Sequence, residues 1–311
     1  VDRDVVSWTA LIAGYAEHGS AEEALICFEA MKSHHIAPNS VTFACILKAC
    51  GRLGDMQIGQ EIHVDIVQEG YESDLTVGNS VVGMYVKCGS MVQARDAFDE
   101  LKVRDVVSWT ALISGYAENG QSEEALNSFE KMCLEGIPPD AVTYACCLKA
   151  CDGRWLIDKG REIHAEIAKK GFERDSFIGS IMVDMYANCG SLIEARHVFE
   201  KFVVRDTVLW SSLISGYVEY GFAEEALEFL EYMRTEEVFL DATVFACALK
   251  ACGIIGVIDK GKQIHNEIFS RGLLGENIVL NNALVGMYAK CGALTKAQKV
   301  FEELILTFSS I

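Results

Sequence analysis

The chain has few prolines, no excess of positive charge and no long apolar run. Only three prolines occur in 311 residues, which suits a mostly helical chain with few rigid loops. Its 27 Lys and Arg face 45 Asp and Glu, and the net charge of −18 has the wrong sign for binding phosphates through a basic surface. The apolar runs are too short to cross a bilayer, so no membrane partner is expected.

The spacings of a zinc site or a catalytic site are also missing. The segment His164-Ala-Glu166 matches the first half of a zinc motif, but the C-x-x-C that must follow occurs nowhere in the chain. Related segments read His63-Val-Asp65 and His265-Asn-Glu267, so we interpret these histidines as residues that pack between helices. The twelve cysteines are expected to be small buried residues of a reducing compartment. We therefore expect neither enzyme activity nor a cofactor.

What the chain does contain is a repeat with a period of 101 residues. VVSWTALIAGYAEHG around Trp8 returns as VVSWTALISGYAENG around Trp109 and as TVLWSSLISGYVEYG around Trp210. Such arrays present one surface many times. Each block divides into three related units, which gives the predicted repeats 5–39, 40–74, 75–105, 106–140, 141–175, 176–206, 207–241, 242–277 and 278–308.

Within a unit the pattern is helix–turn–helix. In 5–39, Trp8 and Ile12 recur at helical spacing, and Gly19 ends the first helix. Ser20-Ala-Glu-Glu23 is typical of a capping box, and Phe28 of the second helix should face inward. One hairpin cannot bury its own apolar faces, so the units must stack. The sequence predicts an all-α, right-handed superhelical solenoid of helix–turn–helix repeats, with the first helices on the concave side.

Two families have helical pairs of this length. The tetratricopeptide repeat, a protein-binding scaffold, is about 34 residues long, whereas the units here cycle through 35, 35 and 31 residues. VVSWTALIAGYAEHG…EEALICFEAMKSHHIAPN, SVTFACILKACGRLGDMQIGQEIHVDIVQEGYESD and LTVGNSVVGMYVKCGSMVQARDAFDELKVRD resemble the P, L and S motifs of PLS-class pentatricopeptide-repeat (PPR) proteins of plant organelles. The resemblance covers residues 5–302 and departs at the end, where ILTFSSI replaces the KVRD and VVRD of the sister units.

The resemblance implies that 1–311 is a single PPR array. It implies sequence-specific binding of single-stranded RNA, one base per repeat, as the recognition module of an RNA-editing or processing factor in a mitochondrion or chloroplast. A further implied partner is a protein of the multiple-organellar-RNA-editing-factor type at the L repeats. The alternative is a tetratricopeptide-like scaffold whose groove takes a peptide, and the acidic charge favours that alternative.

In this family the fifth and the last residue of a repeat read one base together. The implied pairs are Thr9 with Asn39, Asn79 with Asp105, Thr110 with Asp140, Ser180 with Asp206 and Ser211 with Asp241, while Asn282 lacks its expected acidic partner. The L repeats carry Ala44, Ala145 and Ala246, which offer no hydrogen-bonding group. The implied target is 5′-A-x-U-G-x-G-G-x-Y-3′. An Asp or Asn before a helix is also an ordinary N-cap, and spacing alone favours that role, although the two roles are compatible.

Two further sets of residues complete the candidate site. The second residue of each repeat should sandwich a base: Val6, Val107 and Val208 in P repeats, Val41, Val142 and Thr243 in L repeats, and Thr76, Phe177 and Val279 in S repeats. The candidate phosphate contacts are Lys48, Lys87, Lys149, Lys250 and Lys290, which share the helix face of the fifth residue. Solvated rim lysines are the alternative, and Glu17, Glu118 and Glu219 occupy the equivalent P-repeat positions.

Overall fold

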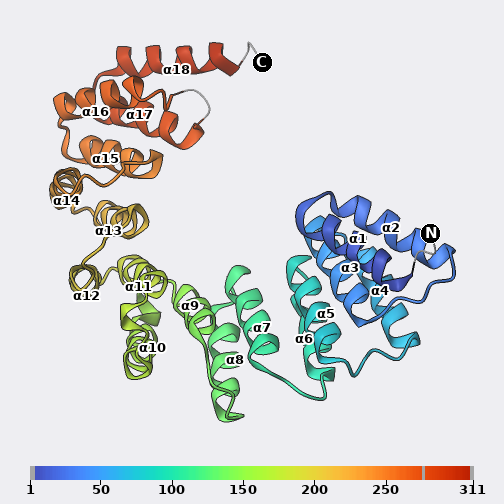
Figure 1. Ribbon diagram of the computed structural model, residues 1–311. Helices are drawn as coiled ribbons and strands as arrows, with labels where there is room; N and C mark the ends of the chain where they lie inside the picture. Colours follow the sequence, from blue (N-terminus) through green and yellow to red (C-terminus); the bar gives the residue numbers. More distant parts are fainter. Residues whose placement is uncertain (1–3, 275–276, 309–311) are drawn as a thin grey trace. The chain divides into compact units, whose positions relative to one another are not determined.

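The chain folds into helices arranged as a solenoid (Figure 1). The computed structural model describes residues 4–274 and 277–308, and this part holds eighteen α-helices, two short 3-10 helices and no strand. The remaining residues of the predicted array, 1–3, 275–276 and 309–311, lie outside the described residues. Within the described part no helix has the length and apolar content that a membrane span requires.

The helices fall into two compact halves. The N-terminal half, Val1–Ala150, contains α1 (Val5–His18), α2 (Ala21–Ser33), α3 (Ser40–Leu53), α4 (Met56–Gln68), α5 (Leu75–Lys87), α6 (Met91–Glu100), α7 (Val106–Glu118), α8 (Ser122–Leu134) and α9 (Ala141–Ala150). The C-terminal half, Cys151–Ile311, contains η1 (Arg154–Leu156), α10 (Ile157–Lys170), η2 (Phe172–Arg174), α11 (Ser176–Asn188), α12 (Leu192–Glu200), α13 (Thr207–Glu219), α14 (Ala223–Thr235), α15 (Ala242–Ile255), α16 (Ile258–Ser270), α17 (Ile278–Lys290) and α18 (Leu294–Phe308).

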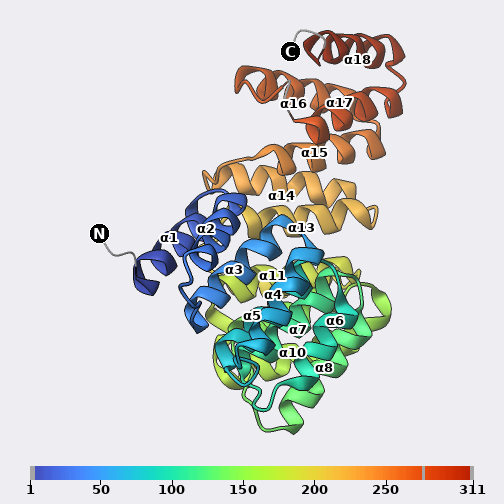
Figure 2. The same cartoon turned by 90° about the vertical axis from the view of Figure 1, so that its right-hand side faces the viewer.

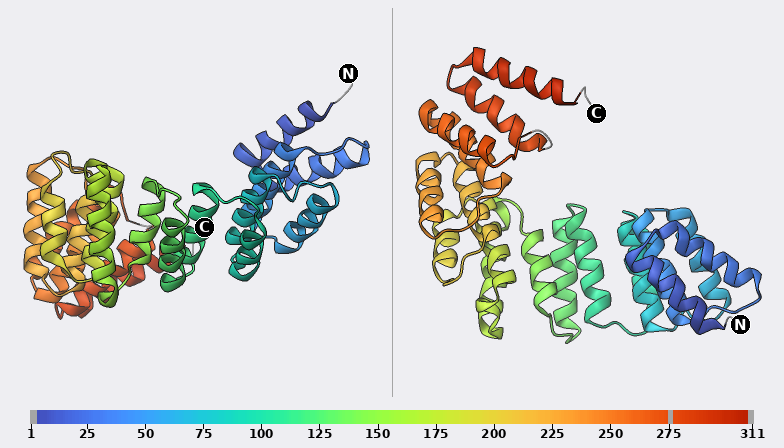
Figure 3. Two further views of the ribbon diagram at one scale, coloured as in Figure 1. Left: turned by 90° about the horizontal axis from the view of Figure 1, so that it is seen from below. Right: turned by 45° about the horizontal axis from the view of Figure 1, so that its top comes forward.

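Within each half the first helices of successive repeats touch one another. The series α1, α3, α5, α7 and α9 is continuous in the N-terminal half, and α11, α13, α15 and α17 form the corresponding series in the C-terminal half. Second helices pack against the first helices on either side of them, as α14 does between α13 and α15 (Figure 2). Figure 3 shows α7, α8 and α9, in green, as neighbouring rods. We call each series of first helices a first-helix row. The repeat boundaries within it stay a prediction.

The periodic tryptophans lie in the core between repeats. Trp109 and Trp210 are buried, and each meets the edge of a phenylalanine from the preceding second helix. The ring centroids of Phe98 and Trp109 are 4.6 Å apart, as are those of Phe199 and Trp210. Truncating such a residue to alanine costs on the order of 3–5 kcal/mol. The tryptophans, which are the most visible feature of the sequence repeat, therefore serve packing in the core.

The repeated histidines also join helices, as the sequence predicts. Each donates or accepts through Nδ1 at the hydroxyl of a tyrosine in the following first helix. The pairs are His63 with Tyr85 at 3.0 Å, His164 with Tyr186 at 2.8 Å and His265 with Tyr288 at 2.9 Å. Across the described residues no group of three or more His, Cys, Asp or Glu has the geometry to hold a metal ion.

The capping box predicted at Ser20 is wrong. Ser20 precedes α2 but makes no side-chain cap hydrogen bond. Its hydroxyl donates instead to the carboxylate of Glu22, two residues further on. In a cap the hydroxyl oxygen accepts a backbone N–H, whereas here the hydroxyl is oriented to give its proton to the charged Glu22 carboxylate and its oxygen receives no backbone N–H.

Candidate functional site

Each first-helix row exposes one side chain per predicted repeat at its second position. The five apolar residues proposed to sandwich bases, Val6, Val107, Phe177, Val208 and Val279, are between 51 % and 68 % exposed. Val41 and Val142 are also more than half exposed, and Thr76 and Thr243 belong to the exposed class. Apolar groups held in water at a regular spacing offer flat surfaces against which planar rings can stack.

The five last residues that are proposed to read bases cap the first helices that follow them, in agreement with their N-cap pattern. In each case one side-chain oxygen, Oδ1, accepts a hydrogen bond from the backbone N–H three residues further on, over 2.8–2.9 Å. The capping residues are Asn39, Asp105, Asp140, Asp206 and Asp241. Such a cap stabilises a helix by about 1 kcal/mol.

Capping occupies only one of the two terminal atoms of each side chain. The other atom, Nδ2 in Asn39 and Oδ2 in the four aspartates, has no hydrogen-bond partner within the described residues. An amide nitrogen there can only donate and a carboxylate oxygen can only accept. The cap therefore orients a free polar atom of defined character, and capping and ligand recognition do not compete.

Asp105 is held as a charged acceptor. Its Oδ1 accepts from the Asn79 amide nitrogen at 3.2 Å as well as from the Ser108 backbone. Burial by itself raises the pKa of the Asp105 carboxyl, but the hydrogen bonds from Ser108 and Asn79 outweigh it and leave the pKa below its usual value. Asn79 and Asp105 are thus the one proposed base-reading pair whose side chains touch directly in the described part of the chain.

Two other pairs are joined through a third residue. Thr9 Oγ1 lies 2.6 Å from Thr42 Oγ1, which donates to Asn39 Oδ1 at 2.9 Å. In the second block Thr110 Oγ1 lies 2.7 Å from Thr143 Oγ1, which donates to Asp140 Oδ1 at 2.8 Å. The role of these bridging threonines is not predicted from the sequence. The one sequence feature that indicates it is a threonine at the third position of two of the three predicted L repeats.

The remaining proposed pairs are not brought together. The hydroxyl of Ser180 donates to the backbone carbonyl of Phe177 at 2.9 Å, and that of Ser211 donates to Val208 at 2.9 Å. Both hydroxyls therefore bond within their own helix rather than to the capping aspartate. Asn282 is exposed on α17.

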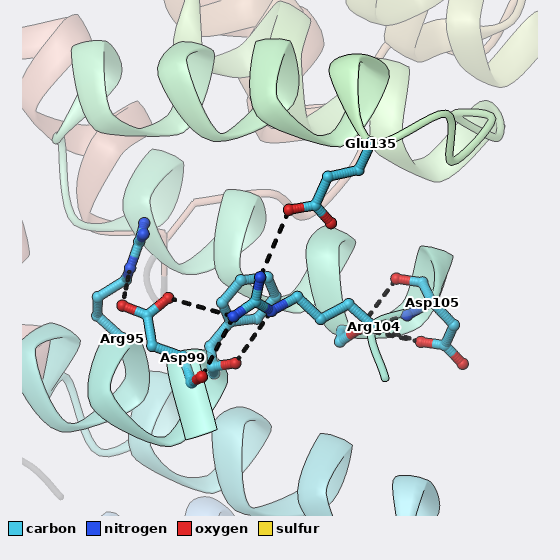
Figure 4. Close-up of polar contacts among 7 residues, drawn as sticks. Arg95, Asp99, Arg104, Asp105 and Glu135 are labelled. Carbon is cyan, nitrogen blue, oxygen red and sulfur yellow. Dashed lines mark hydrogen bonds and ion pairs between the residues drawn. The ribbon is translucent and has the colours of Figure 1, made fainter. Parts of the chain in front are cut away.

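An arginine anchors the loop that carries Asp105 (Figure 4). The Arg104 guanidinium lies 4.9 Å from the centroid of the Phe98 ring, and its Nη1 is 3.4 Å from Glu135 Oε1. Arg205 repeats this arrangement before Asp206, at 4.8 Å from the Phe199 ring and 2.8 Å from Glu236. The Arg-Asp pair at the end of two predicted S repeats thus has two roles: the arginine anchors the loop, and the aspartate caps the next helix. The anchoring role is not predicted from the sequence.

Three of the five candidate phosphate-binding lysines are engaged with glutamates. Nζ–Oε distances are 3.3 Å for Lys48 with Glu17, 3.2 Å for Lys87 with Glu118 and 3.6 Å for Lys250 with Glu219. All of these side chains are about half exposed, so each pair is worth only about 0–1 kcal/mol. Lys149 and Lys290 are exposed and make no ion pair within the described residues.

A cavity of about 410 Å³ opens on the first-helix row of the C-terminal half. Thr243 and Val279, the second residues of two successive predicted repeats, line it together with Ala246, Lys250 and Lys290. Its walls are mainly apolar, and its charged lining residues are these two lysines and Glu219. It therefore suits a planar ring that carries an anionic group.

A larger hollow, of about 770 Å³, lies on the side of the second helices α14 and α16. Its lining includes Glu224, Glu228, Glu231 and Asp259, with Lys260 as the one cation among its lining residues. Carboxylates at this density repel phosphates. The smaller cavity is therefore the better candidate for an anionic ligand.

Stacked helical pairs that expose one row of side chains define an α-helical repeat protein. The sequence pattern of one family, described as PPR repeat family, matches residues 3–52 and 104–152. A second pattern, described as PPR repeat, matches residues 79–106, 180–206, 208–238 and 282–306. These matches together cover more than half of the chain. The chain belongs to the pentatricopeptide-repeat family.

The similar sequences come from Arabidopsis thaliana. Two chloroplastic pentatricopeptide repeat-containing proteins are 36 % and 33 % identical over 100 % and 97 % of this chain, which spans 36 % and 49 % of their length. A mitochondrial one is 33 % identical over 97 % of this chain, which spans 29 % of it. The chain thus covers less than half of each relative.

A similar solved structure is that of the pentatricopeptide repeat protein PPR10 in complex with an 18-nt psaJ RNA element. The TM-score is 0.81 at 19 % identity, over 98 % of this chain and 45 % of PPR10. At this identity the likeness shows the fold alone, and it agrees with the predicted all-α repeat solenoid.

Proposed function

We propose that this chain binds single-stranded RNA sequence-specifically, one base per repeat, as a PLS-type array with the target 5′-A-x-U-G-x-G-G-x-Y-3′. The observation that carries the proposal is the free side-chain atom of each capping residue, which lies on the same first-helix row as the exposed apolar residues of the second positions. A base stacked on the apolar residues would turn its edge toward that atom. The solved PPR10 structure is a complex of that protein with an RNA element, and it supports the same class of ligand.

The donor and acceptor patterns agree with the proposed bases. Adenine presents an amino group beside the acceptor N1, so it matches a hydroxyl acceptor at Thr9 and the Asn39 amide donor. Guanine presents two adjacent donors, N1–H and the amino group, which match acceptors at Thr110 and Asp140. Uracil presents a single donor, N3–H, between two carbonyls, which matches the charged carboxylate of Asp105 beside the Asn79 amide.

The L repeats would hold bases without reading them. Ala246 forms part of the 410 Å³ cavity and has no polar side-chain atom, while Thr243 and Val279 supply the two walls. Lys250 and Lys290 would meet the phosphates beside that base. The L repeats are also where we place a protein partner of the multiple-organellar-RNA-editing-factor type, since their fifth residues have no base to read.

The cellular setting is proposed from the relatives. Their names place them in chloroplasts or mitochondria, and we propose one of these organelles for this chain, within an RNA-editing or processing factor. A tetratricopeptide-like peptide-binding role is the second candidate. The net charge of −18 favours it, because carboxylates attract a basic peptide and repel RNA.

Fluorescence anisotropy with a labelled nine-base RNA tests the proposal. The RNA 5′-AAUGAGGAU-3′ satisfies the target, and 5′-UGAAGUAGA-3′ has the same composition with every read position changed. We expect the first to bind at least tenfold more tightly at low salt, since one lost base-edge contact alone costs about 1–3 kcal/mol. Equal affinity, or no binding to either, would refute the proposal.

A single substitution tests the register of the proposed code. Thr110→Asn would create the pair found at Asn79 and Asp105, so the fourth base should change from guanine toward uracil. The seventh base, read by Ser211, serves as the control within the same molecule and should remain guanine. A fourth-base preference that stays with guanine would show that the fifth position has been assigned wrongly.

A further inference from the structure

Two buried threonines, Thr42 and Thr143, connect the proposed base-reading residues to each other. Both are fully buried at the third position of the first helix of an L repeat, with 0 % exposure. Each belongs to the repeat that follows the one whose base is read. Thr42 bridges Thr9 to Asn39, and Thr143 bridges Thr110 to Asp140.

The hydrogen bonds of Thr42 fix the direction of every proton in the bridge. Its hydroxyl has one proton and two lone pairs. The proton goes to Asn39 Oδ1 at 2.9 Å, because a carbonyl oxygen cannot donate. One lone pair accepts the Asn39 backbone N–H at 3.2 Å. The second lone pair must then accept the proton of the Thr9 hydroxyl, whose oxygen is 2.6 Å away. The Thr9 hydroxyl therefore donates to Thr42, and only its lone pairs are left for a ligand.

The second block shows the same arrangement around an aspartate. Thr143 donates to Asp140 Oδ1 at 2.8 Å and accepts from the Asp140 backbone N–H at 3.4 Å. It therefore receives the proton of the Thr110 hydroxyl, 2.7 Å away. The lone pairs of Thr110 and the free Oδ2 of Asp140 are then two acceptors held at one place, which is the complement of the two adjacent donors of guanine.

The third block provides a natural contrast. Val244 occupies the equivalent position and has no hydroxyl, although Asp241 still caps its helix through the Val244 backbone N–H at 2.9 Å. The Ser211 hydroxyl there bonds to Val208 of its own helix. Without the bridging hydroxyl, the cap is kept and the link to the fifth residue is lost.

We propose that Thr42 and Thr143 are positioning residues for base recognition, each acting from the next repeat to hold the fifth residue beside the cap as an acceptor. This inference rests on the proposed function. It implies that the fidelity of a base-reading pair depends on a third residue in the following repeat. The first and fourth bases should accordingly be read more strictly than the seventh.

Base-resolved binding of the full chain tests the role of Thr143. The probes are 5′-AAUGAGGAU-3′ and two variants in which uracil replaces guanine at base four or at base seven. For Thr143→Val we expect the guanine-over-uracil preference at base four to fall by about fivefold to tenfold, the loss expected for one hydrogen bond of about 1 kcal/mol. The preference at base seven should not change. Thr143→Ser, which keeps the hydroxyl, should keep both preferences.

Thr42→Val is tested independently with a further RNA in which guanine replaces adenine at base one. We expect the preference for adenine at base one to weaken and the preference at base four to stay unchanged. Circular dichroism and the urea midpoint of each variant show whether it is folded. A preference at base four that survives Thr143→Val, or a uniform loss of affinity for all three RNAs, would overturn the role of the threonine. A wild-type chain that does not discriminate among the RNAs would refute the proposed function itself, and this inference with it.

Discussion

At the scale of single residues, the side chains that cap the first helices have two terminal atoms, and the cap uses only one of them. Oδ1 of Asn39 and of Asp140 caps a helix, and the neighbouring Nδ2 or Oδ2 stays free. Asn and Asp are about equally good N-caps, so the cap alone does not select between them. The difference between them lies in the free atom, which donates in one case and accepts in the other.

A reciprocal exchange of these two residues should exchange their bases. Asp140→Asn keeps the cap and turns the free atom into a donor, so the fourth base should change from guanine to adenine. Asn39→Asp should change the first base from adenine to guanine. Anisotropy with RNAs that differ at one base measures both, and we expect each preference to reverse by roughly tenfold or more.

The matched control for this exchange is Asp140→Ala. It removes cap and reader together, and we expect it to cost about 1 kcal/mol of stability and to weaken discrimination without reversing it. Urea midpoints for Asp140→Asn should equal those of the wild type. If Asp140→Asn still preferred guanine, the free atom would not be the one that reads the base.

How much of the candidate site can be predicted from the sequence depends on how far apart along the chain its contacting residues lie. The caps follow from an Asp or Asn directly before a helix, so local sequence suffices for them. The second-position residues Val6 and Val107 come from the family resemblance, and both are exposed. The contact between Thr9 and Thr42 joins residues 33 positions apart and depends on how two repeats stack. Ser20 fails for another reason, since its hydroxyl donates to Glu22 and its oxygen accepts no backbone N–H. The base-reading roles themselves stay predictions.

At the scale of helices, the histidine–tyrosine contacts join a second helix to the first helix that follows it. His63 joins α4 to α5, and His164 joins α10 to α11. Burial lowers the pKa of both imidazoles, because the charged form loses its hydration; for His164 the neighbouring Lys201 adds to this. Both histidines are therefore held neutral in the folded chain. The repeated I-H dipeptide predicted a packing role, but the tyrosine partner depends on the stacking of two helices.

These two histidines should make the fold sensitive to mild acid. Since their folded pKa lies below the unfolded value of about 6.5, the unfolded state takes up protons first. Their contribution to stability is complete above that pH and is lost progressively as the pH falls through it toward the folded pKa. We expect the urea midpoint of the wild type to drop between pH 7.5 and 5.5.

Replacing both histidines should remove part of that drop. The variant His63→Gln/His164→Gln should show a smaller change of midpoint between the two pH values than the wild type. His18→Gln is the control for the loss of an imidazole elsewhere in the chain, since the His18 side chain is 85 % exposed. An identical pH response in the wild type and the double variant would assign the acid sensitivity to other groups.

At the scale of the whole molecule, the proposed function requires an acidic chain to bind a polyanion. Three of the lysines on the first-helix rows are already paired with Glu17, Glu118 and Glu219. Because each exposed pair is worth only about 0–1 kcal/mol, a lysine can exchange its carboxylate for a phosphate at little cost. The carboxylate then remains within a few ångströms of the phosphate and repels it. Under the proposed function, the glutamates would hold the overall affinity down and leave discrimination to the proposed base-reading residues.

Removing these three carboxylates should strengthen binding without changing its specificity. For Glu17→Gln/Glu118→Gln/Glu219→Gln we expect tighter binding of every RNA, including the scrambled one. The slope of log K against log salt should steepen by up to about 2, since each lysine newly bound to a single-stranded phosphate adds about 0.7. Anisotropy titrations at several salt concentrations measure both quantities. The ratio of affinities for target and scrambled RNA should stay constant.

The control removes the same number of charges from the second helices, through Glu22→Gln/Glu123→Gln/Glu224→Gln. All three side chains are exposed in the first turns of α2, α8 and α14, and none contacts a first-helix lysine within the described residues. Charges further from the bound phosphates than the Debye length of about 8 Å at physiological salt are largely screened, so this variant should gain much less affinity. An equal gain in both variants would mean that net charge limits RNA binding, and the paired glutamates would then have no special part in it.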